Sequence, residues 1–289
     1  DIYGTYAGLV EYNNCINLMK GAIECCERFS TVSPTYAEEI KNPYYAHGLD
    51  PIIRKHEIKL TGILNGIDDM GYNPQYDKHL YAPYTAEDFA GKKVCKSELQ
   101  RMLGLNDSAD TPIIAMISRL AAHKGLDLVT TVIDEILQDD VQFVLLGTGE
   151  SHFEGWFSDL ARRYPGKVSA NIMFNGDLSR KIYSGSDIFL MPSKSEPCGL
   201  SQMIACRYGT IPVVRETGGL KDSIKPLESG FTFTNYNAHD MMFVVREAIA
   251  AYKNKEEWAK LMYRAATTDF SWNQSAKQYE ALYFDMLKY

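Results

Sequence analysis

Short apolar segments alternate with helical patterns along the second half of the chain. The apolar segments are rich in Ile, Val, Phe and Leu, and we expect a strand at each of them: 113–117, 142–146, 171–174, 188–191, 211–214 and 231–233. Between most of them, apolar residues recur at helical spacing, at 126–137, 153–164 and 201–208. Continuous apolar strands separated by helices are typical of a parallel sheet that is covered on both faces. The pattern therefore predicts an α/β fold, with a Rossmann-like doubly wound parallel sheet over residues 112–270.

Three further helical patterns close the chain, at 239–252, 255–267 and 273–287. Asn237 and Ser271 are suitable caps for the first and the last of these helices. The last pattern carries a stripe of aromatic residues, namely Trp272, Tyr279, Tyr283 and Phe284. We expect this stripe to pack in the core or between domains, and we treat residues 271–289 as a separate carboxyl-terminal helix.

The first hundred residues follow a different pattern. They predict a helix at 18–28, a short strand at 29–33 and the start of another helix at 34–41, before a passage rich in turn residues. One strand and two helices cannot enclose a core of their own. We therefore expect residues 1–62 to be the remnant of an amino-terminal domain and residues 63–111 to be an interdomain connection. A strand without its sheet has an open edge that invites pairing with another chain.

Composition excludes several classes of protein. Of 289 residues, 45% are hydrophobic and 23% are charged, which is typical of an ordinary globular protein. A formal net charge of -7 argues against a general nucleic-acid-binding protein, but a few local cations would suffice for a small anionic ligand. No apolar run approaches the roughly 18 residues that span a membrane, and residues 1–4 do not resemble a signal peptide. We expect neither nucleic acid nor a membrane as a partner.

The six cysteines indicate a reducing compartment. None belongs to a C-x-x-C pair, and no group of His and Cys residues has the spacing of a zinc site. We expect free thiols in a cytoplasmic protein, without a metal or another cofactor.

The first candidate for ligand binding follows directly after the first strand of the main domain. Arg119 lies at the carboxyl end of this strand, where open α/β sheets bind ligands, and Lys124 lies at the start of the next helix. A guanidinium fork and an ammonium group are together suited to hold a diphosphate. Taken alone, the segment is also compatible with two solvated loop cations.

The segment Gly147-Thr148-Gly149-Glu150 resembles a dinucleotide-binding fingerprint only in part. His152 stands where the fingerprint needs its third glycine, and the segment follows the second strand of its unit rather than the first. We interpret it as a tight turn that borders a ligand site.

Two later strand-to-helix turns carry the most informative residues. Glu196 precedes Pro197-Cys198-Gly199-Leu200 at one strand end, and Thr217-Gly218-Gly219 opens another helix about twenty residues later. Free backbone N–H groups and glycines at such turns suit a phosphorylated sugar. The Glu196 carboxylate could accept hydrogen bonds from sugar hydroxyls and stabilise positive charge at an anomeric carbon, or it could simply complement the start of a helix.

Two nearby residues stay open between a structural and a binding role. Cys198 has no evident histidine partner in the sequence, so we expect it to fill a tight space rather than to act as a nucleophile. Phe174 ends its predicted strand on the same rim. It could stack on a nucleobase, but we favour a place in the core.

Several motifs, taken together, resemble bacterial glycogen synthases and plant starch synthases. In chain order they are Thr31-Val32-Ser33-Pro34-Thr35-Tyr36-Ala37, Asn65-Gly66-Ile67-Asp68, Ser118-Arg119-Leu120 with Lys124-Gly125-Leu126-Asp127, Pro192-Ser193 with Glu196-Pro197-Cys198-Gly199-Leu200, Tyr208-Gly209-Thr210 with Thr217-Gly218-Gly219-Leu220, and Ser271-Trp272. The resemblance spans nearly the whole chain in the family's order, and the combination is specific although no single motif is.

The resemblance implies a GT-B architecture, in which two Rossmann-like domains enclose the active site. It implies a parent enzyme that is a hexosyltransferase, moving glucose from ADP-glucose to the non-reducing end of an α-1,4-glucan such as glycogen. The configuration is retained and no metal is required. On matching positions, the implied catalytic residues are Glu196, which holds the donor glucose, and Arg119 and Lys124, which neutralise the diphosphate. The implied substrate-binding residues are Cys198, Gly199, Leu200, Thr217, Gly218 and Gly219, with Phe174 at the position of a ring that stacks on adenine.

The chain also departs from the family. The family's Lys-x-Gly-Gly-Leu loop and a catalytic-site histidine belong to its amino-terminal domain, and the only Gly-Gly-Leu here is at 218–220. We therefore expect this chain to be the donor-binding half, to have the missing amino-terminal domain as its partner, and to have little activity alone. Ile204 stands where related retaining enzymes often have a second glutamate, which favours the synthase branch.

Two alternatives stay open at this point. The first is another retaining GT-B glycosyltransferase that uses a UDP-sugar. The second is a non-catalytic module that binds a nucleotide or a glucan.

Overall fold

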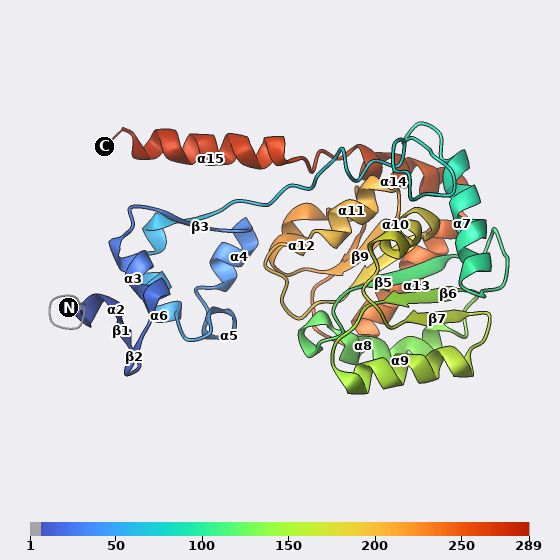
Figure 1. The fold of residues 1–289 in the computed structure, drawn as a ribbon, viewed down its shortest axis with the longest axis horizontal. Helices are drawn as coiled ribbons and strands as arrows, with labels where there is room; N and C mark the ends of the chain where they lie inside the picture. The colour runs from blue at the N-terminus through green and yellow to red at the C-terminus, as the bar shows by residue number, and fades with distance from the viewer. Residues whose placement is uncertain (1–6, 289) are drawn as a thin grey trace.

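A computed structural model describes residues 7–288 of the chain, so residues 1–4, which we compared with a signal peptide, lie outside this range. The described chain forms two lobes that lie side by side (Figure 1). Each lobe has its own cluster of buried apolar side chains. The large cluster surrounds a six-stranded sheet, and the small one contains Ile23, Ala46, Ile52 and Ile53.

The large lobe is built on a parallel sheet. Its strands are β5 (Ile113–Ile117), β6 (Gln142–Leu146), β7 (Val168–Asn171), β8 (Ile188–Met191), β9 (Ile211–Arg215) and β10 (Phe231–Phe233). They lie in the order β10-β9-β8-β5-β6-β7, and each neighbouring pair is parallel. The chain builds β5, β6 and β7 in one direction, returns to the middle, and builds β8, β9 and β10 in the other. The predicted doubly wound sheet is confirmed.

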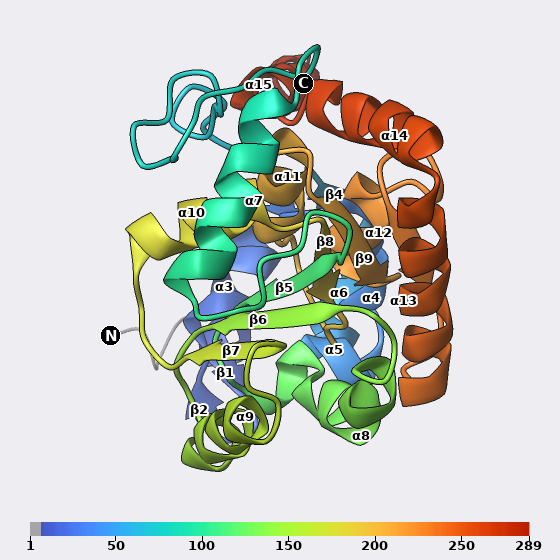
Figure 2. The same cartoon turned by 90° about the vertical axis from the view of Figure 1, so that its right-hand side faces the viewer.

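Helices cover both faces of this sheet. They are α7 (Ala90–Met102), α8 (Leu126–Ile136), α9 (Ser151–Arg163), α10 (Gly176–Gly185), α11 (Ser201–Arg207), α12 (Gly218–Ser223), α13 (Ala238–Lys253) and α14 (Lys255–Thr267). The last helix, α15 (Trp272–Met286), follows them in the chain but does not cover the sheet. Figure 2 shows α8, α9 and α13 on one side of the sheet and α7, α10 and α11 on the other. A strand between two helical layers is buried on both faces, and for this reason every residue of β6 is buried. Among the helices of residues 7–288, none is both long and apolar enough to cross a membrane.

The strand predicted at 171–174 is misplaced, because the observed strand β7 begins and ends three residues earlier. The register of the sheet pairs Leu146 with Asn171, and both strands end there. Phe174 therefore lies beyond the strand, in the loop before α10, and its side chain is 97% exposed. The interpretation of this ring as a core residue is wrong.

The aromatic stripe of the last helix is also not packed as expected. Trp272, Tyr283 and Phe284 are about half exposed, and Ser275 is the buried residue of α15. In Figure 1, α15 leaves the large lobe and extends along the small one. The predicted caps differ: Asn237 accepts two backbone hydrogen bonds at the start of α13, whereas the Ser271 side chain makes no capping bond to α15.

The small lobe consists of short elements. They are α2 (Ala7–Val10), β1 (Glu11–Tyr12), β2 (Cys15–Ile16), α3 (Leu18–Cys25), β3 (Phe29–Thr31), α4 (Pro34–Glu39), α5 (Pro43–Ala46), α6 (Asp50–Lys55) and β4 (Leu60–Gly62). Within the described residues, β3 pairs only with β4, in parallel. The lobe thus holds two two-stranded sheets, β1-β2 and β3-β4, where the sequence predicted a single strand, and it has a small core of its own. That residues 1–62 are the remnant of a larger domain stays a prediction.

Residues 63–111 are a connection only in their first part. Ile67 forms a parallel bridge with Ser271, where the chain passes between the lobes for a second time. Farther along, Cys95 and Leu99 of α7 belong to the core of the large lobe. The boundary after residue 62 remains a prediction that the separate core clusters support, whereas α7 is part of the large lobe rather than of a linker.

Candidate active site

The candidate site lies where the winding of the sheet reverses, between β5 and β8. These two strands are neighbours, but the chain leaves β5 toward β6 and leaves β8 toward β9. Such a reversal opens a crevice at the carboxyl ends of the two strands, where doubly wound sheets bind ligands. The segment with Arg119 and Lys124 follows β5, and the segment with Glu196 follows β8.

Lys124 and Glu196 form an ion pair in this crevice. Lys124 Nζ donates a hydrogen bond to Glu196 Oε2 at 2.6 Å, and the two side chains are 16% and 11% exposed. The buried hydroxyl of Ser193 donates to the same oxygen at 3.0 Å. Within residues 7–288, no side chain or backbone group donates to Glu196 Oε1. The carboxylate is therefore held by one oxygen and can accept from a ligand with the other.

Arg119 is the second cation of the segment that follows β5. Its side chain is exposed, and no residue of the described range pairs with its guanidinium. His123 lies among the charges of the site: burial first, and then Lys124 and Arg119, lower the pKa of its imidazole, while Glu196 and Glu150 act in the opposite direction. The structure thus brings Arg119, Lys124 and Glu196 together around His123, a residue to which sequence reasoning gave no role.

The turn at Thr217–Gly219 packs against the loop that carries Glu196. The N–H of Gly219 donates to the carbonyls of Glu196 and Pro197 at 3.1 and 3.2 Å. Gly218 has a φ of +45°, and a Cβ on it would collide with the Glu196 carbonyl oxygen. The two glycines are needed because one protein loop approaches another, not because the backbone is open to a ligand. The expectation of free N–H groups at Gly218 and Gly219 is wrong.

The same turn is also covered by the small lobe. Glu39 Oε1 accepts hydrogen bonds from Thr217 Oγ1 at 2.8 Å and from the N–H of Gly218 at 3.0 Å. A substrate-binding role for Thr217, Gly218 and Gly219 stays a prediction, because these groups bond to the protein itself in this structure.

The loop after Glu196 holds the other predicted substrate-binding residues. Cys198 is 8% exposed, and burial raises the pKa of its thiol, so the side chain is a neutral space-filling group as expected. Gly199 has a φ of +68°, which a residue with a Cβ rarely adopts. Leu200 is 43% exposed. Binding roles for these three residues remain predictions.

The segment 147–150 is a tight turn, as interpreted from the sequence. Gly149 forms a parallel bridge with Leu120, and Glu150 Oε1 accepts from the N–H of Ala122 at 3.0 Å. The turn therefore supports the backbone of the segment that carries Arg119 and Lys124.

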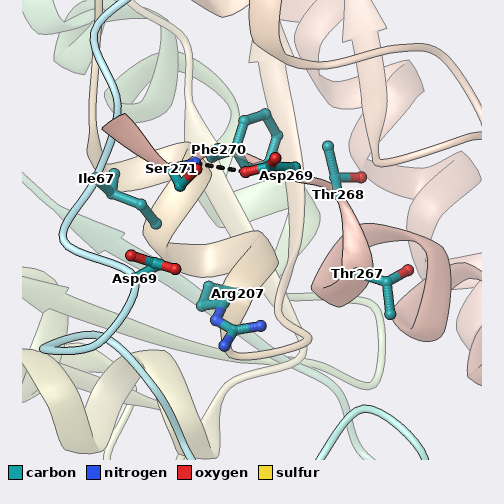
Figure 3. A pocket seen from close by; sticks show the side chains of 8 residues that line it. All are labelled: Ile67, Asp69, Arg207, Thr267, Thr268, Asp269, Phe270 and Ser271. Carbon is teal, nitrogen blue, oxygen red and sulfur yellow. Dashed lines mark hydrogen bonds between the residues drawn. The ribbon is translucent and has the colours of Figure 1, made fainter. Parts of the chain in front are cut away.

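A separate hollow lies away from this crevice. Figure 3 shows its lining, which comes from the place where the chain crosses between the lobes: Ile67, Asp69, Arg207, Thr267, Thr268, Asp269, Phe270 and Ser271. Its volume is about 190 Å³, and none of the predicted site residues lines it. Within residues 7–288, no group of three or more His, Cys, Asp or Glu side chains is arranged to hold a metal ion.

Comparison with known families gives the class of protein to which this fold and crevice belong. The sequence matches the family described as "Glycosyl transferases group 1" over residues 104–265, more than half of the chain, so the chain belongs to this family. Residues 3–55 match the family described as "Starch synthase catalytic domain".

The relatives include bacterial glycogen synthases. The one from Geobacillus thermodenitrificans is 48% identical over 285 residues, which are 96% of this chain and 59% of that protein. The one from Clostridium acetobutylicum is also 48% identical, with 96% and 60% covered. This chain thus spans about three fifths of the length of the curated relatives that it matches. The predicted resemblance to glycogen and starch synthases is confirmed.

Solved structures agree with this assignment. The catalytic domain of starch synthase IV from Arabidopsis thaliana, solved with ADP and acarbose bound, has a TM-score of 0.89 and 38% identity, covering 95% of this chain and 58% of that one. A sucrose-phosphate synthase from Thermosynechococcus elongatus, at 17% identity and a TM-score of 0.63, shares the fold. The predicted GT-B type of fold is confirmed.

Proposed function

We propose that this chain is the donor-binding part of a glycogen or starch synthase, which moves glucose from ADP-glucose to the non-reducing end of an α-1,4-glucan with retention of configuration. The observation that carries the proposal is the Lys124–Glu196 ion pair in the crevice between β5 and β8, with Arg119, whose guanidinium has no partner among residues 7–288, in the same segment as Lys124. The glycogen synthases among the relatives and the ADP-bound starch synthase support the choice of substrates.

The three charged side chains match the charges of this reaction. The bond between the anomeric carbon and the diphosphate oxygen breaks, so negative charge collects on the leaving diphosphate and positive charge on the sugar ring. An ammonium or guanidinium about 4 Å from a phosphate oxygen contributes roughly 4 kcal/mol before desolvation, at an effective dielectric constant of about 20. Lys124 and Arg119 would supply this attraction, while Glu196 would accept hydrogen bonds from the glucose hydroxyls and stabilise the charge on the ring.

The ion pair suggests how the donor is received. In the structure, Lys124 and Glu196 neutralise each other. When the diphosphate arrives, the flexible lysine side chain turns toward it, and Glu196 Oε2 becomes free for a sugar hydroxyl while Ser193 still holds the carboxylate. Binding of the diphosphate and of the sugar would thus be coupled through one side chain.

Phe174 supplies a stacking face for the base. Its ring is 97% exposed in the loop before α10, and base–aromatic stacking contributes about 1–3 kcal/mol per base. Stacking tolerates every base, so Phe174 does not separate ADP-glucose from the UDP-sugar alternative. Competition between ADP-glucose and UDP-glucose for the purified chain would decide between them.

The acceptor glucan and the amino-terminal domain complete the proposal. The curated relatives are longer than this chain, and the small lobe offers β3 and β4 as strands on which a larger sheet can build. We therefore place the rest of the cleft in an amino-terminal domain of the same protein. The six free cysteines favour a cytoplasmic location.

Thermal unfolding with nucleotide tests the proposal on the chain itself. A ligand at a hundred times its dissociation constant stabilises a protein by about 2.7 kcal/mol, so millimolar ADP should raise the melting temperature. The Lys124→Met variant should lose most of this rise. Lys260→Met, which removes an exposed ion pair on α14, should keep it. A folded chain that neither ADP nor UDP stabilises would refute a nucleotide-sugar site here.

A further inference from the structure

The small lobe docks on the large one through a pair of antiparallel helices. At the start of α4, the N–H and the hydroxyl of Thr35 donate to the two carboxylate oxygens of Asp222, at 2.8 and 2.6 Å. At the end of α4, Glu39 accepts from Thr217 and Gly218, at the start of α12. Because Asp222 lies near the end of α12, the two helices run in opposite directions and are held together at both ends.

A third contact joins the small lobe directly to the loop of Glu196. The hydroxyl of Ser33, which is fully buried, donates to the carbonyl of Pro197 at 2.7 Å. The hydroxyl oxygen of Ser33 also accepts from the N–H of Tyr36 at 3.1 Å and so caps α4. The start of α4 and the backbone next to Glu196 are thus fixed by one side chain.

The contacts of Glu39 also lead to Glu196. Glu39 holds the hydroxyl of Thr217 and the N–H of Gly218, and the next residue, Gly219, donates to the Glu196 carbonyl. Thr217 is fully buried, so no solvent could replace Glu39 at its hydroxyl without a local opening. The Glu39 carboxylate is therefore linked to the backbone of Glu196 through two hydrogen bonds, one donated by Gly218 to Glu39 and one donated by Gly219 to Glu196.

The docked carboxylate is not fully satisfied. Glu39 Oε2 is buried and has no hydrogen-bond partner within the described residues. An unpaired buried carboxylate oxygen is unfavourable because it has lost its water. The unpaired oxygen therefore offsets part of the stabilisation that the two hydrogen bonds of Glu39 Oε1 provide.

From this geometry we infer that Glu39 is a positioning residue that couples docking of the small lobe on α12 to the placement of Glu196. The Thr217–Gly219 turn is the connecting element, and the Glu196 loop takes its present form only while Glu39 is in place. The contacts stand by themselves, whereas their meaning for a sugar donor rests on the proposed function.

Hydrogen exchange of the 289-residue chain tests the coupling. In Glu39→Ala, the buried donors at 217 and 218 lose their acceptor, and exchange should rise about tenfold or more in peptides that cover 217–220 and also 194–200. Glu39→Gln keeps one acceptor oxygen and should restore most of the protection. The control is Glu38→Ala on the same helix, where an exposed glutamate pairs with Lys41, and it should leave both peptides unchanged. Exchange that rises only at 217–220, or nowhere, would overturn the coupling.

Nucleotide binding separates positioning from general support. Glu39→Ala should weaken binding of ADP-glucose more than binding of ADP, since Glu196 faces the sugar, and Glu39→Gln should restore the difference. Equal weakening for both ligands would show that Glu39 only supports the fold. If the unaltered chain bound neither nucleotide, the proposed function would fail, while the exchange comparison would still decide the coupling.

Discussion

The ion pair between Lys124 and Glu196 gives a prediction that needs no ligand. Replacing Lys124 by Met keeps most of the apolar stem of the side chain but removes the charge. The Glu196 side chain, which is 11% exposed, then keeps the Ser193 hydroxyl as its one partner among residues 7–288. The variant should be less stable, because a carboxylate that has lost most of its water loses its counter-charge as well.

The magnitude follows from burial. Removing one partner of a fully buried ion pair costs about 3–5 kcal/mol, whereas an exposed pair is worth about 0–1 kcal/mol. The Lys124–Glu196 pair lies near the buried end of this range, but Ser193 keeps one hydrogen bond. We therefore expect a loss of about 2–3 kcal/mol for Lys124→Met, which corresponds to a drop of about 5 °C or more in melting temperature for a protein of this size.

The assay is urea unfolding followed by circular dichroism, with a matched control in the same chain. Lys260 pairs with Glu256 at 2.8 Å, a distance close to that of the crevice pair, but its side chains are 52% and 79% exposed. Lys260→Met should therefore cost less than about 1 kcal/mol. The double variant Lys124→Met with Glu196→Gln should recover part of the lost stability, because the lone charge is gone.

Two results would refute this reasoning. If Lys124→Met cost no more than Lys260→Met, the crevice would be as well solvated as the surface of α14. If the free energy of unfolding that the double variant loses equalled the sum of the losses in Lys124→Met and Glu196→Gln, the two side chains would not interact.

Three further predictions follow from single side chains. Phe174→Ala should change stability by less than about 0.5 kcal/mol, because the ring is 97% exposed, but should weaken ADP binding by about 1–3 kcal/mol in calorimetry; unchanged affinity would remove the ring from the site. Burial lowers the pKa of Lys92 to about 7, so between about pH 7 and 10 the unfolded chain binds more protons than the folded chain. The free energy of unfolding should therefore rise with pH, by up to about 1.4 kcal/mol per pH unit. In urea titrations, Lys92→Met should lose this slope, whereas Lys93→Met, at the exposed neighbouring position, should keep it. Gly218→Ala should destabilise the chain by at least about 2 kcal/mol in the same titrations, since its φ is positive and the new Cβ would meet the carbonyl oxygen of Glu196; a neutral effect would mean that this turn is free to move.

Much of the site could be predicted from residue type and position along the chain. Arg119 and Glu196 follow apolar segments that form neighbouring strands, β5 and β8. In a parallel sheet, residues after neighbouring strands meet at one edge, so their proximity follows from the topology alone. The pairing of Lys124 with Glu196 is the direct result.

Other features depended on contacts that no local pattern contains. The apolar run continues to Phe174 and so predicts a strand that ends there, but pairing with β6 ends the strand at Asn171. The sequence predicts that a ligand approaches the backbone at Gly218 and Gly219, yet the group that lies against both glycines is the Glu196 loop. Glu39 gave no signal at all, because a glutamate near the end of a helix is ordinary until its partner is known.

The sequence by itself determined the doubly wound sheet and the charges at its edge, since the strands are continuous apolar runs and the charged residues of the candidate site follow the ends of strands. Only the tertiary structure decided what those groups contact. Thr217 and Glu39 are 178 residues apart, and whether their side chains meet depends on how two lobes pack. Burial then determines the result, because a polar group that is removed from water must find a partner within the protein.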